Sequence, residues 1–372
     1  VTIASADANG AFASDGVNTD KWTPIASASS ILNTTIVSKL NAGTHVAITT
    51  TGAGTDAGHI TVNAALEANT TATGQLSLVA DGDIQLNANI HTGASVLLKA
   101  AGHITQAAST SVNTNGGNVT YWADSDSSGA GGISLLAGTS ANPTAIVTNG
   151  GNITFGGGSD PTATSAIGVN GIRLDGFATL NAGTGNVSLR GTSTATAANG
   201  GAGLRLVNST ITGYDITLVG QGPANTGGSA TGSATTTTVT ASHNLNLSAD
   251  LMTVGVNNNV TATAGESLVV NSAQTWGSNN LVLSAGGDVD VNANLDASSG
   301  GGLTVRFGQN TTDGGASAYR VNGVNVKIAL PTSAGSKFRW KKGSTGSDNE
   351  LVFNNGYLAF AANASGSRTA PN

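Results

Sequence analysis

The chain of 372 residues contains no cysteine, only 6 prolines, and few charged or aromatic side chains. The absence of cysteine excludes disulfides, thiolate metal sites and cysteine nucleophiles. Charged residues make up 9% and aromatic residues 4% of the sequence, so the chain is unlike the highly charged segments that remain disordered. No stretch reaches the roughly 18 consecutive apolar residues of a membrane-spanning helix. We therefore expect no membrane span.

The sequence is rich instead in small residues, among them 53 glycines, together with alanine, threonine, serine and asparagine. Valine, isoleucine, leucine and threonine occur in short runs in which apolar and polar residues alternate, which predicts β-strands. Long stretches of small residues, such as 192–203 and 220–238, interrupt this alternation and predict loops. No stretch predicts a helix of useful length. We therefore expect an all-β fold.

Short segments repeat along the chain. GDIQLNANI at 82–90 is repeated as GDVDVNANL at 287–295, and ITVNAAL at 60–66 is a shorter third copy. SVLLKAAGHI at 95–104 matches the ten residues that begin at Gln75, at a spacing of 20. Repetition at a short, fixed period is the signature of a fold built from stacked units.

The spacing of apolar residues supports the same period. Ile133 and Ile153 are 20 residues apart, and Leu281 and Leu303 are 22 apart. A repeat of about 20 residues made of short strands is too short for a helical crossover and fits one coil of a parallel β-helix. We predict a single-stranded parallel β-helix, also called a β-solenoid, with about 20 residues per coil and loop insertions on one face.

A glycine followed by a polar and then an apolar residue precedes many of the expected strands. We expect Gly82 to supply a positive φ, Asp83 to hydrogen-bond nearby backbone, and Ile84 to point into the core. Where the polar position recurs, we predict one column of structural corners, formed by His59, Asp83, His103, Asn118, Asn152, Asn186 and Asp288. An alternative for His59, Asp83 and His103 is a shared cation, because coils lie only about 4.8 Å apart.

Asparagines that follow the repeated strands are a second structural candidate. Asn63, Asn87 and Asn292 occupy the same place in the three copies of the repeat. We predict that these side chains point inward and form an asparagine ladder, in which each amide bonds to the same residue of the next coil.

These coils, with WTPIASASSILNTTIVSKLNAGTHVAITTTGAGTDAGHITVNAAL at 22–66, resemble the repeat region of bacterial filamentous-haemagglutinin-like proteins. Members of that family are large exoproteins secreted by the two-partner route. The resemblance covers about residues 20–310. It implies a right-handed parallel β-helix, an extracellular location at the bacterial cell surface, and a role in adhesion, aggregation or biofilm formation.

The C-terminal part of the chain is basic. Residues 303–372 contain eight of the 14 Lys and Arg residues but only three of the 20 acids. We predict that the segment around KFRWKK departs from the coil pattern and either caps the solenoid or docks onto another copy. The docking candidates are Lys337, Arg339, Trp340, Lys341 and Lys342. The expected organisation is an N-terminal cap at 1–35, a parallel β-helix at 36–328, and a basic, aromatic-bearing cap or docking segment at 329–372.

Two tryptophans, Trp122 and Trp276, are candidates for contact with a glycan or a partner protein. Alternation places Val119 and Tyr121 inward, which leaves Trp122 outward, where an indole can stack on a sugar. The alternative is a ring that lies over a neighbouring coil or loop.

One short segment has the opening of a calcium loop. DSDSSG at 124–129 offers oxygens from Asp124, Asp126 and Ser128. Leu135 stands where such a loop carries its bidentate glutamate, so the alternative is a turn without metal. We expect no other cofactor.

Three functions compete. The favoured function is a non-enzymatic adhesive rod whose partner is a glycan or protein of a host cell or matrix. The second is a self-assembling subunit of an extracellular filament or sheath, in which the partner is another copy of the chain. The third is a polysaccharide-cleaving enzyme. We expect no enzyme, because the acids are scattered and no hydrolase or nucleotide-binding motif occurs. We expect no nucleic-acid partner, because most of the chain is acidic.

Overall fold

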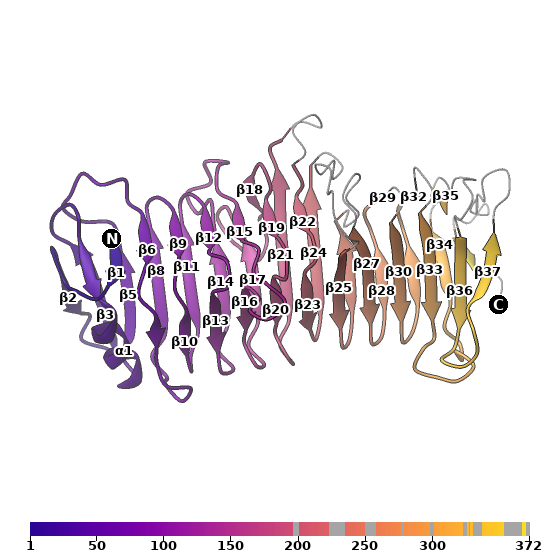
Figure 1. Ribbon diagram of the computed structural model, residues 1–372, viewed down its shortest axis with the longest axis horizontal. Helices are drawn as coiled ribbons and strands as arrows, with labels where there is room; N and C mark the ends of the chain where they lie inside the picture. The colour runs from indigo at the N-terminus through magenta and orange to yellow at the C-terminus, as the bar shows by residue number, and fades with distance from the viewer. Residues whose placement is uncertain are drawn as a thin grey trace. The chain divides into compact units, whose positions relative to one another are not determined.

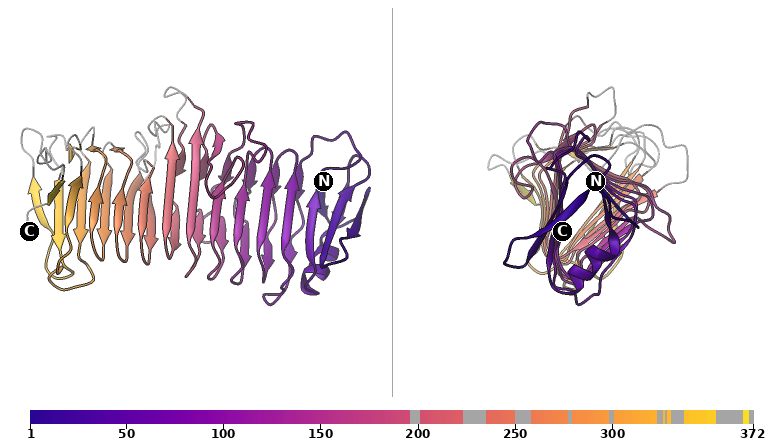
Figure 2. Two further views of the ribbon diagram at one scale, coloured as in Figure 1. Left: turned by 180° about the vertical axis from the view of Figure 1, so that it is seen from behind. Right: turned by 90° about the vertical axis from the view of Figure 1, so that its left-hand side faces the viewer.

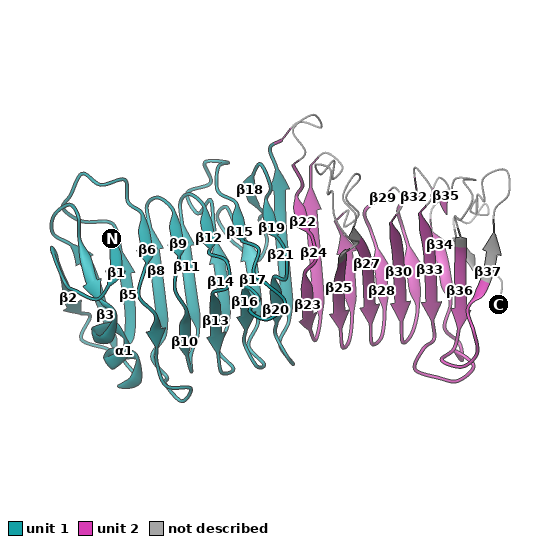
Figure 3. Cartoon of the chain, in the orientation of Figure 1, with its two compact units in different colours: residues 1–194 teal, residues 195–372 magenta. Residues whose placement is uncertain are grey.

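The structure is a computed structural model of the chain. It describes residues 1–195, 201–222, 235–249, 258–276, 279–297, 301–322, 326, 328–329, 337–352 and 367–369. The chain forms two compact units, unit 1 at residues 1–194 and unit 2 at residues 195–372 (Figure 1, Figure 3). In the described residues nearly every element is a strand, so the predicted all-β class is confirmed. No described helix is long and apolar enough to cross a membrane.

In unit 1 the strands form three sheets, and each sheet name below refers only to strands within this unit. Sheet A contains, in spatial order, β4 (Ser30–Leu32), β1 (Thr2–Ala4), β6 (Ile60–Val62), β9 (Ile84–Leu86), β12 (Ile104–Gln106), β15 (Ile133–Leu135) and β19 (Ile172–Leu174). Sheet B contains β2 (Gly10–Ser14), β3 (Thr19–Pro24), β5 (His45–Thr49), β8 (Leu76–Ala80), β11 (Val96–Ala100), β14 (Val119–Trp122), β17 (Ile153–Gly156) and β21 (Val187–Ser193), with β18 (Ala166–Gly168) also on β21. Sheet C contains β7 (Leu66–Glu67), β10 (Ile90–Thr92), β13 (Ser111–Thr114), β16 (Ala145–Val147) and β20 (Thr179–Asn181).

The chain visits these sheets in a constant order. Strand β8 lies in sheet B, β9 in sheet A and β10 in sheet C, and the cycle begins again with β11 in sheet B (Figure 1, Figure 2). We call three such successive strands a rung. Neighbouring strands are parallel except β2 and β3, which are antiparallel. Long parallel sheets visited in this order are consistent with the predicted β-solenoid.

In unit 2 the strands again form three sheets, named D, E and F for their strands within this unit. Sheet D contains β23 (Thr210–Gly213), β25 (Thr235–Ala241), β27 (Asn258–Ala264), β30 (Asn280–Ala285), β33 (Gly302–Phe307), β36 (Lys337–Lys342) and β37 (Asn349–Val352). Sheet E contains β24 (Ile216–Gln221), β26 (Leu245–Ser248), β28 (Leu268–Val270), β31 (Val289–Val291), β34 (Tyr319–Asn322) and β38 (Ser367–Thr369). Sheet F contains β29 (Gln274–Trp276), β32 (Leu295–Ala297) and β35 (Ile328–Ala329). Strand β22 (Leu204–Leu206) precedes them.

The rung length varies more than the sequence repeat suggests. Leu76 pairs with Val96, and Leu281 with Leu303, which agrees with the spacings of 20 and 22. Val119 pairs with Ile153, a step of 34 residues, because the rung between them carries longer loops. Ile133 and Ile153 are therefore not equivalent, contrary to the prediction: Ile133 lies in sheet A and Ile153 in sheet B.

The core of unit 1 consists of columns of identical or similar apolar residues. In sheet A every rung contributes a fully buried isoleucine, at Ile60, Ile84, Ile104, Ile133 and Ile172. Burial of each such side chain stabilises the fold by about 1.5–3 kcal/mol. Where the interior is wider, the Tyr121 and Phe155 rings stack at 4.7 Å. The buried Tyr121 hydroxyl donates to Gln106 Oε1 at 2.8 Å, which satisfies both polar groups.

Gly82 is required for close packing and not for a turn of positive φ. Its φ is not positive, whereas that of Gly58 is +72°. A Cβ at residue 82 would lie 2.6 Å from the Ala57 carbonyl oxygen and 2.7 Å from His59 Nδ1 of the adjacent rung. The backbones of adjacent rungs approach so closely at this corner that no side chain fits between them.

The N-terminal part of unit 1 contains a helix, α1 (Asn33–Asn41), that the sequence analysis missed. Its two fully buried residues, Ile36 and Leu40, are four positions apart and so lie on one face. The helix stops before Gly43, whose φ of +82° is the left-handed conformation typical of a residue just beyond a helix. Gly43 and the Ile36–Leu40 spacing are the signals that could have predicted this helix.

The predicted boundaries at residues 35 and 328 do not coincide with those of the two units. Strand β1 lies inside sheet A between β4 and β6, so part of segment 1–35 belongs to the parallel sheets. Antiparallel pairing occurs where sheet B begins, at β2, and where sheets D and E end, at β37 and β38.

We expect Leu98→Ala to lower the free energy of unfolding by about 2–5 kcal/mol, because Leu98 is fully buried and its removal leaves a cavity. The matched control is Leu97→Ala on the same strand, where the side chain points away from the core; it should change stability by about 0.5 kcal/mol or less. Urea denaturation followed by circular dichroism measures both. Equal losses would contradict the assigned strand orientation.

Candidate functional surface

The seven predicted corner residues do not form a single column: six of them form two columns in unit 1, and Asp288 lies in unit 2. His59, Asp83 and His103 precede successive strands of sheet A. His59 Nδ1 accepts from the Asp83 N–H at 2.8 Å, and Asp83 Oδ1 accepts from the His103 N–H at 2.7 Å. His103 Nδ1 accepts in turn from the Gly132 N–H at 2.9 Å. Each side chain thus caps a backbone N–H of the next rung.

The second column precedes strands β14, β17 and β21 of sheet B. Asn118 Oδ1 accepts from the Asn152 N–H, and Asn152 Oδ1 from the Asn186 N–H, both at 2.8 Å. A carboxylate, an amide or an imidazole nitrogen can each supply the acceptor, which explains why Asp, Asn and His occupy this position. In the described residues no group of three or more His, Asp or Glu side chains could hold a metal ion, so the structure lends no support to the shared cation.

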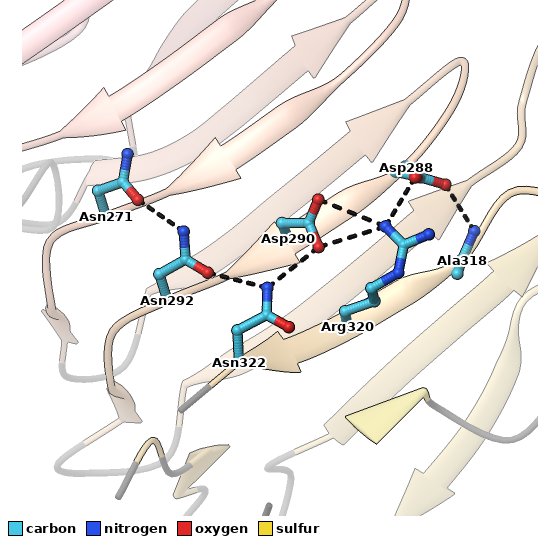
Figure 4. A network of polar contacts seen from close by, with 7 residues as sticks. All are labelled: Asn271, Asp288, Asp290, Asn292, Ala318, Arg320 and Asn322. Atoms are coloured by element: carbon cyan, nitrogen blue, oxygen red, sulfur yellow. Dashed lines mark hydrogen bonds and ion pairs between the residues drawn. The ribbon is translucent and has the colours of Figure 1, made fainter. Parts of the chain in front are cut away.

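The three predicted ladder asparagines do not form one ladder, and their side chains are exposed and do not point inward. Asn87 Nδ2 donates to Asn63 Oδ1 at 2.9 Å, and both residues are exposed. In unit 2, Asn292 lies between Asn271 and Asn322 in a continuous chain of amide hydrogen bonds of 2.7 and 2.9 Å (Figure 4). The sequence analysis missed Asn271 and Asn322 because they lack the Asn-Ala-Asn signature.

Asp288 takes part in an ion-pair network beside this ladder (Figure 4). Burial opposes its ionisation, but the Ala318 N–H at 2.8 Å and the Arg320 guanidinium at 2.6 Å hold the pKa of Asp288 below its ordinary value of 3.8. Arg320 also contacts Asp290 at 3.4 Å. The network joins the polar faces of β31 and β34.

The two tryptophans differ in their accessibility. Trp276 is fully buried, so it cannot be the predicted partner contact. The alternation along its strand, β29, places Gln274 and Trp276 inward and Thr275 outward. Trp122 points outward as predicted, but its Nε1–H donates to the Gly158 carbonyl and Lys99 Nζ lies 4.0 Å from the ring centre. Trp122 therefore packs against a neighbouring loop and a cation.

The candidate calcium loop is a tight turn stabilised by its own carboxylate. Asp124 Oδ1 accepts from the Ser128 hydroxyl at 3.0 Å and from the backbone N–H groups of Gly129 and Ala130 at 2.9 and 3.2 Å. Asp126 Oδ1 accepts from the Ser128 N–H at 3.2 Å. These hydrogen bonds hold the segment as a turn without requiring a metal ion.

The basic segment KFRWKK forms strand β36, which lies within sheet D. Strand β36 is parallel to β33 and antiparallel to β37. Both backbone edges of β36 are therefore paired, and Phe338 is buried. Arg306, on β33, forms a bidentate pair with Asp348 beside the same strands, at 2.9 and 2.7 Å. The side chain of Lys337 lies outside the described part of the structure.

A groove on sheet C was not predicted from the sequence. It has a volume of about 440 Å³, and its floor carries Glu67, His91 and Asn113 at directly paired positions of β7, β10 and β13. His91 Nδ1 lies 2.5 Å from Glu67 Oε2, and His91 Nε2 lies 3.0 Å from Asn113 Nδ2. Only the register between rungs brings these residues together, because they are 24 and 22 positions apart.

We expect Asp83→Ala to destabilise unit 1 by about 1 kcal/mol, because the His103 N–H loses its acceptor. Asp83→Asn is the matched control, since asparagine supplies the same acceptor at the equivalent corners of sheet B. Hydrogen exchange of the His103 amide should accelerate in the alanine variant and remain close to the parent rate in the asparagine variant. Acceleration in both would show that the carboxylate charge, and not the acceptor, is required.

The lowered pKa of Asp288 predicts an acid-dependent loss of stability in unit 2. A group whose pKa is lower in the folded state stabilises the fold above its unfolded pKa, and that stabilisation is lost as the pH falls through the folded pKa. The free energy of unfolding should therefore fall below about pH 4, and less steeply in Asp288→Asn. Asp296→Asn, which alters an exposed carboxylate on β32, is the control. An Asp288→Asn variant with the parent's pH profile would contradict this role.

No protein-family model, curated protein or solved structure matches this chain. The resemblance to filamentous-haemagglutinin-like proteins therefore depends on the sequence pattern alone, and the function of the chain has to be argued from the geometry described above.

Proposed function

We propose that the chain is a non-enzymatic, extracellular adhesive β-solenoid of the bacterial cell surface, wound as a single-stranded, right-handed parallel β-helix. The observation that carries this proposal is the covering of the outer sheet faces by polar side chains that bond from rung to rung. In the asparagine ladders each amide bonds to an amide of the next rung, and at the corners each side-chain acceptor bonds to a backbone N–H of the next rung. Such faces are polar and bonded from rung to rung, which suits a scaffold that presents a binding surface away from the cell.

The runner-up, a filament subunit that grows by end-to-end stacking, requires unpaired parallel strands at the ends of the sheets. Where sheet B begins and where sheets D and E end, the edge strands are antiparallel instead. Strand β2 pairs antiparallel with β3, and β37 pairs antiparallel with β36. A parallel copy of the chain would have to displace these strands before it could continue the sheets. Pairing of β36 on both edges also argues against KFRWKK as the joint.

The enzyme alternative has one geometric point in its favour. Glu67, His91 and Ser111 lie in the order of an acid–base–nucleophile triad, since Ser111 Oγ is 3.0 Å from His91 Nε2. Nucleophilic catalysis also needs donors for the developing oxyanion. The backbone of β13 is paired on both sides, and the Ser111 N–H donates to Asn89 Oδ1. Asn113 Nδ2 competes for the same imidazole nitrogen. This arrangement supports a polar surface and not a hydrolytic centre.

Adhesion can be tested with beads that carry the purified chain. We expect these beads to adhere to mammalian epithelial cells or extracellular matrix at several times the level of beads that carry albumin. The same chain, unfolded in urea before coupling, is the matched control for a folded binding surface. Adhesion that is no stronger than in the controls would overturn the proposal, and concentration-dependent filaments in electron micrographs would favour the runner-up.

A further inference from the structure

The groove on sheet C of unit 1 has the chemistry of a ligand site. Its volume of about 440 Å³ falls in the range of about 300–1,000 Å³ that small-molecule sites occupy. Polar side chains from four rungs line it, namely Glu67, Thr70, His91, Asn113, Asn115 and Asn149. They project from the sheet because the residues between them, such as Ile90 and Val112, are fully buried.

Hydrogen bonding along the floor fixes the direction of its donors. Glu67 carries a carboxylate, which only accepts when ionised. The 2.5 Å contact therefore places a proton on His91 Nδ1. In the neutral imidazole, Nε2 is then the acceptor for Asn113 Nδ2 at 3.0 Å. Glu67, His91 and Asn113 form a pre-organised line of polar groups across three rungs.

The groove has a surplus of acceptors. Asn113 Oδ1 is buried and has no hydrogen-bond partner among the described residues, which is costly unless a donor is supplied. The Glu67 side chain is 53% exposed, so its carboxylate remains open to a ligand from the solvent side. A ligand that brings O–H donors can bond to this open carboxylate.

The lining residues, all of them in the described part of unit 1, include no lysine or arginine. Together with the Glu67 carboxylate, this disfavours an anionic ligand, because no positive charge compensates it. A peptide cannot add a strand here, since β10 and β13 are each paired on both sides. Ala68 and Val147 are the only purely aliphatic lining residues, so large apolar anchors would find no matching pocket.

We propose that this groove binds an uncharged saccharide, whose hydroxyl groups donate to Glu67 and accept from the asparagine amides. The inference rests on the proposed adhesive function and identifies the surface that performs it. The threonine methyl groups and Val147 provide apolar contact for the sugar ring, and the polar line fixes its orientation.

The experiment uses the full chain and a panel of neutral oligosaccharides of glucose, galactose, mannose and N-acetylhexosamines, first on an array and then by titration calorimetry. Glu67→Gln removes the open carboxylate, and Asn113→Ala removes the amide that holds His91, so we expect each to weaken binding about tenfold. His91→Ala breaks the line at its centre and should weaken binding at least as much. His59→Asn is the matched control, because it changes an exposed histidine to the residue found at the equivalent corners of sheet B.

Circular dichroism and thermal unfolding establish that each variant folds like the parent. Saccharide binding that falls in the three groove variants but not in His59→Asn supports the proposal. Absence of binding to every neutral saccharide, or binding unchanged in all three groove variants, overturns it. Bead adhesion distinguishes failure of the proposed adhesive function from failure of the groove as its binding site. Adhesion that persists in the groove variants would retain the adhesive function and reject the groove as the adhesive surface. Saccharide binding by a chain whose beads do not adhere would retain the groove as a saccharide site and reject the adhesive function.

Discussion

The structure depends on the pairing of each strand, in parallel and in register, with the equivalent strand of the next rung. Parallel register places the same side chain above itself at about 4.8 Å. Every position along a rung therefore becomes a column, and a residue is tolerated only if it can stack on its own kind or on a close substitute. The isoleucines of sheet A satisfy this requirement by apolar burial. The asparagine ladders satisfy it with an amide, which donates on one side and accepts on the other.

At the corners, the stacking of rungs in register provides hydrogen-bond acceptors for backbone N–H groups. The N–H of the corner residue, just before the strand, points toward the rung before it and bonds there to a side chain. A side-chain acceptor at the preceding rung supplies this bond, as Asp83 does for His103 and Asn118 does for Asn152. Adjacent backbones must then approach closely, which leaves room only for glycine at residue 82. The Gly-polar-apolar sequence pattern therefore reflects both the need for a side-chain acceptor and the close approach of adjacent backbones.

This explains how much of the structure could be predicted from the sequence. The all-β class, the parallel sheets and the identity of the corner residues follow from local patterns, because each requires only a few neighbouring residues. The division of the corners into separate columns could not be predicted, since it depends on loop lengths that change the step from 20 to 34 residues. Trp276 was misassigned for a related reason: a strand of three residues has too short an alternation to define its phase. The helix α1 has only one apolar face of two buried residues, which is a weak signal within a β-rich sequence.

The groove on sheet C could not be predicted from the sequence either, because only the register between rungs brings its floor residues together. The line of residues on its floor also differs in chemistry from the other columns. In a structural column each residue finds its partner in a residue of similar chemistry, so a change at one rung is felt chiefly by its neighbours, as in other repeat folds. Glu67, His91 and Asn113 are chemically different, and their line ends in an acceptor without a partner. Such an arrangement adds less to stability than a ladder of identical amides would, because one buried acceptor remains unpaired. At the other end of the line the Glu67 carboxylate is 53% exposed, and an open carboxylate beside a groove of this size is the physical reason to regard the groove as a binding surface.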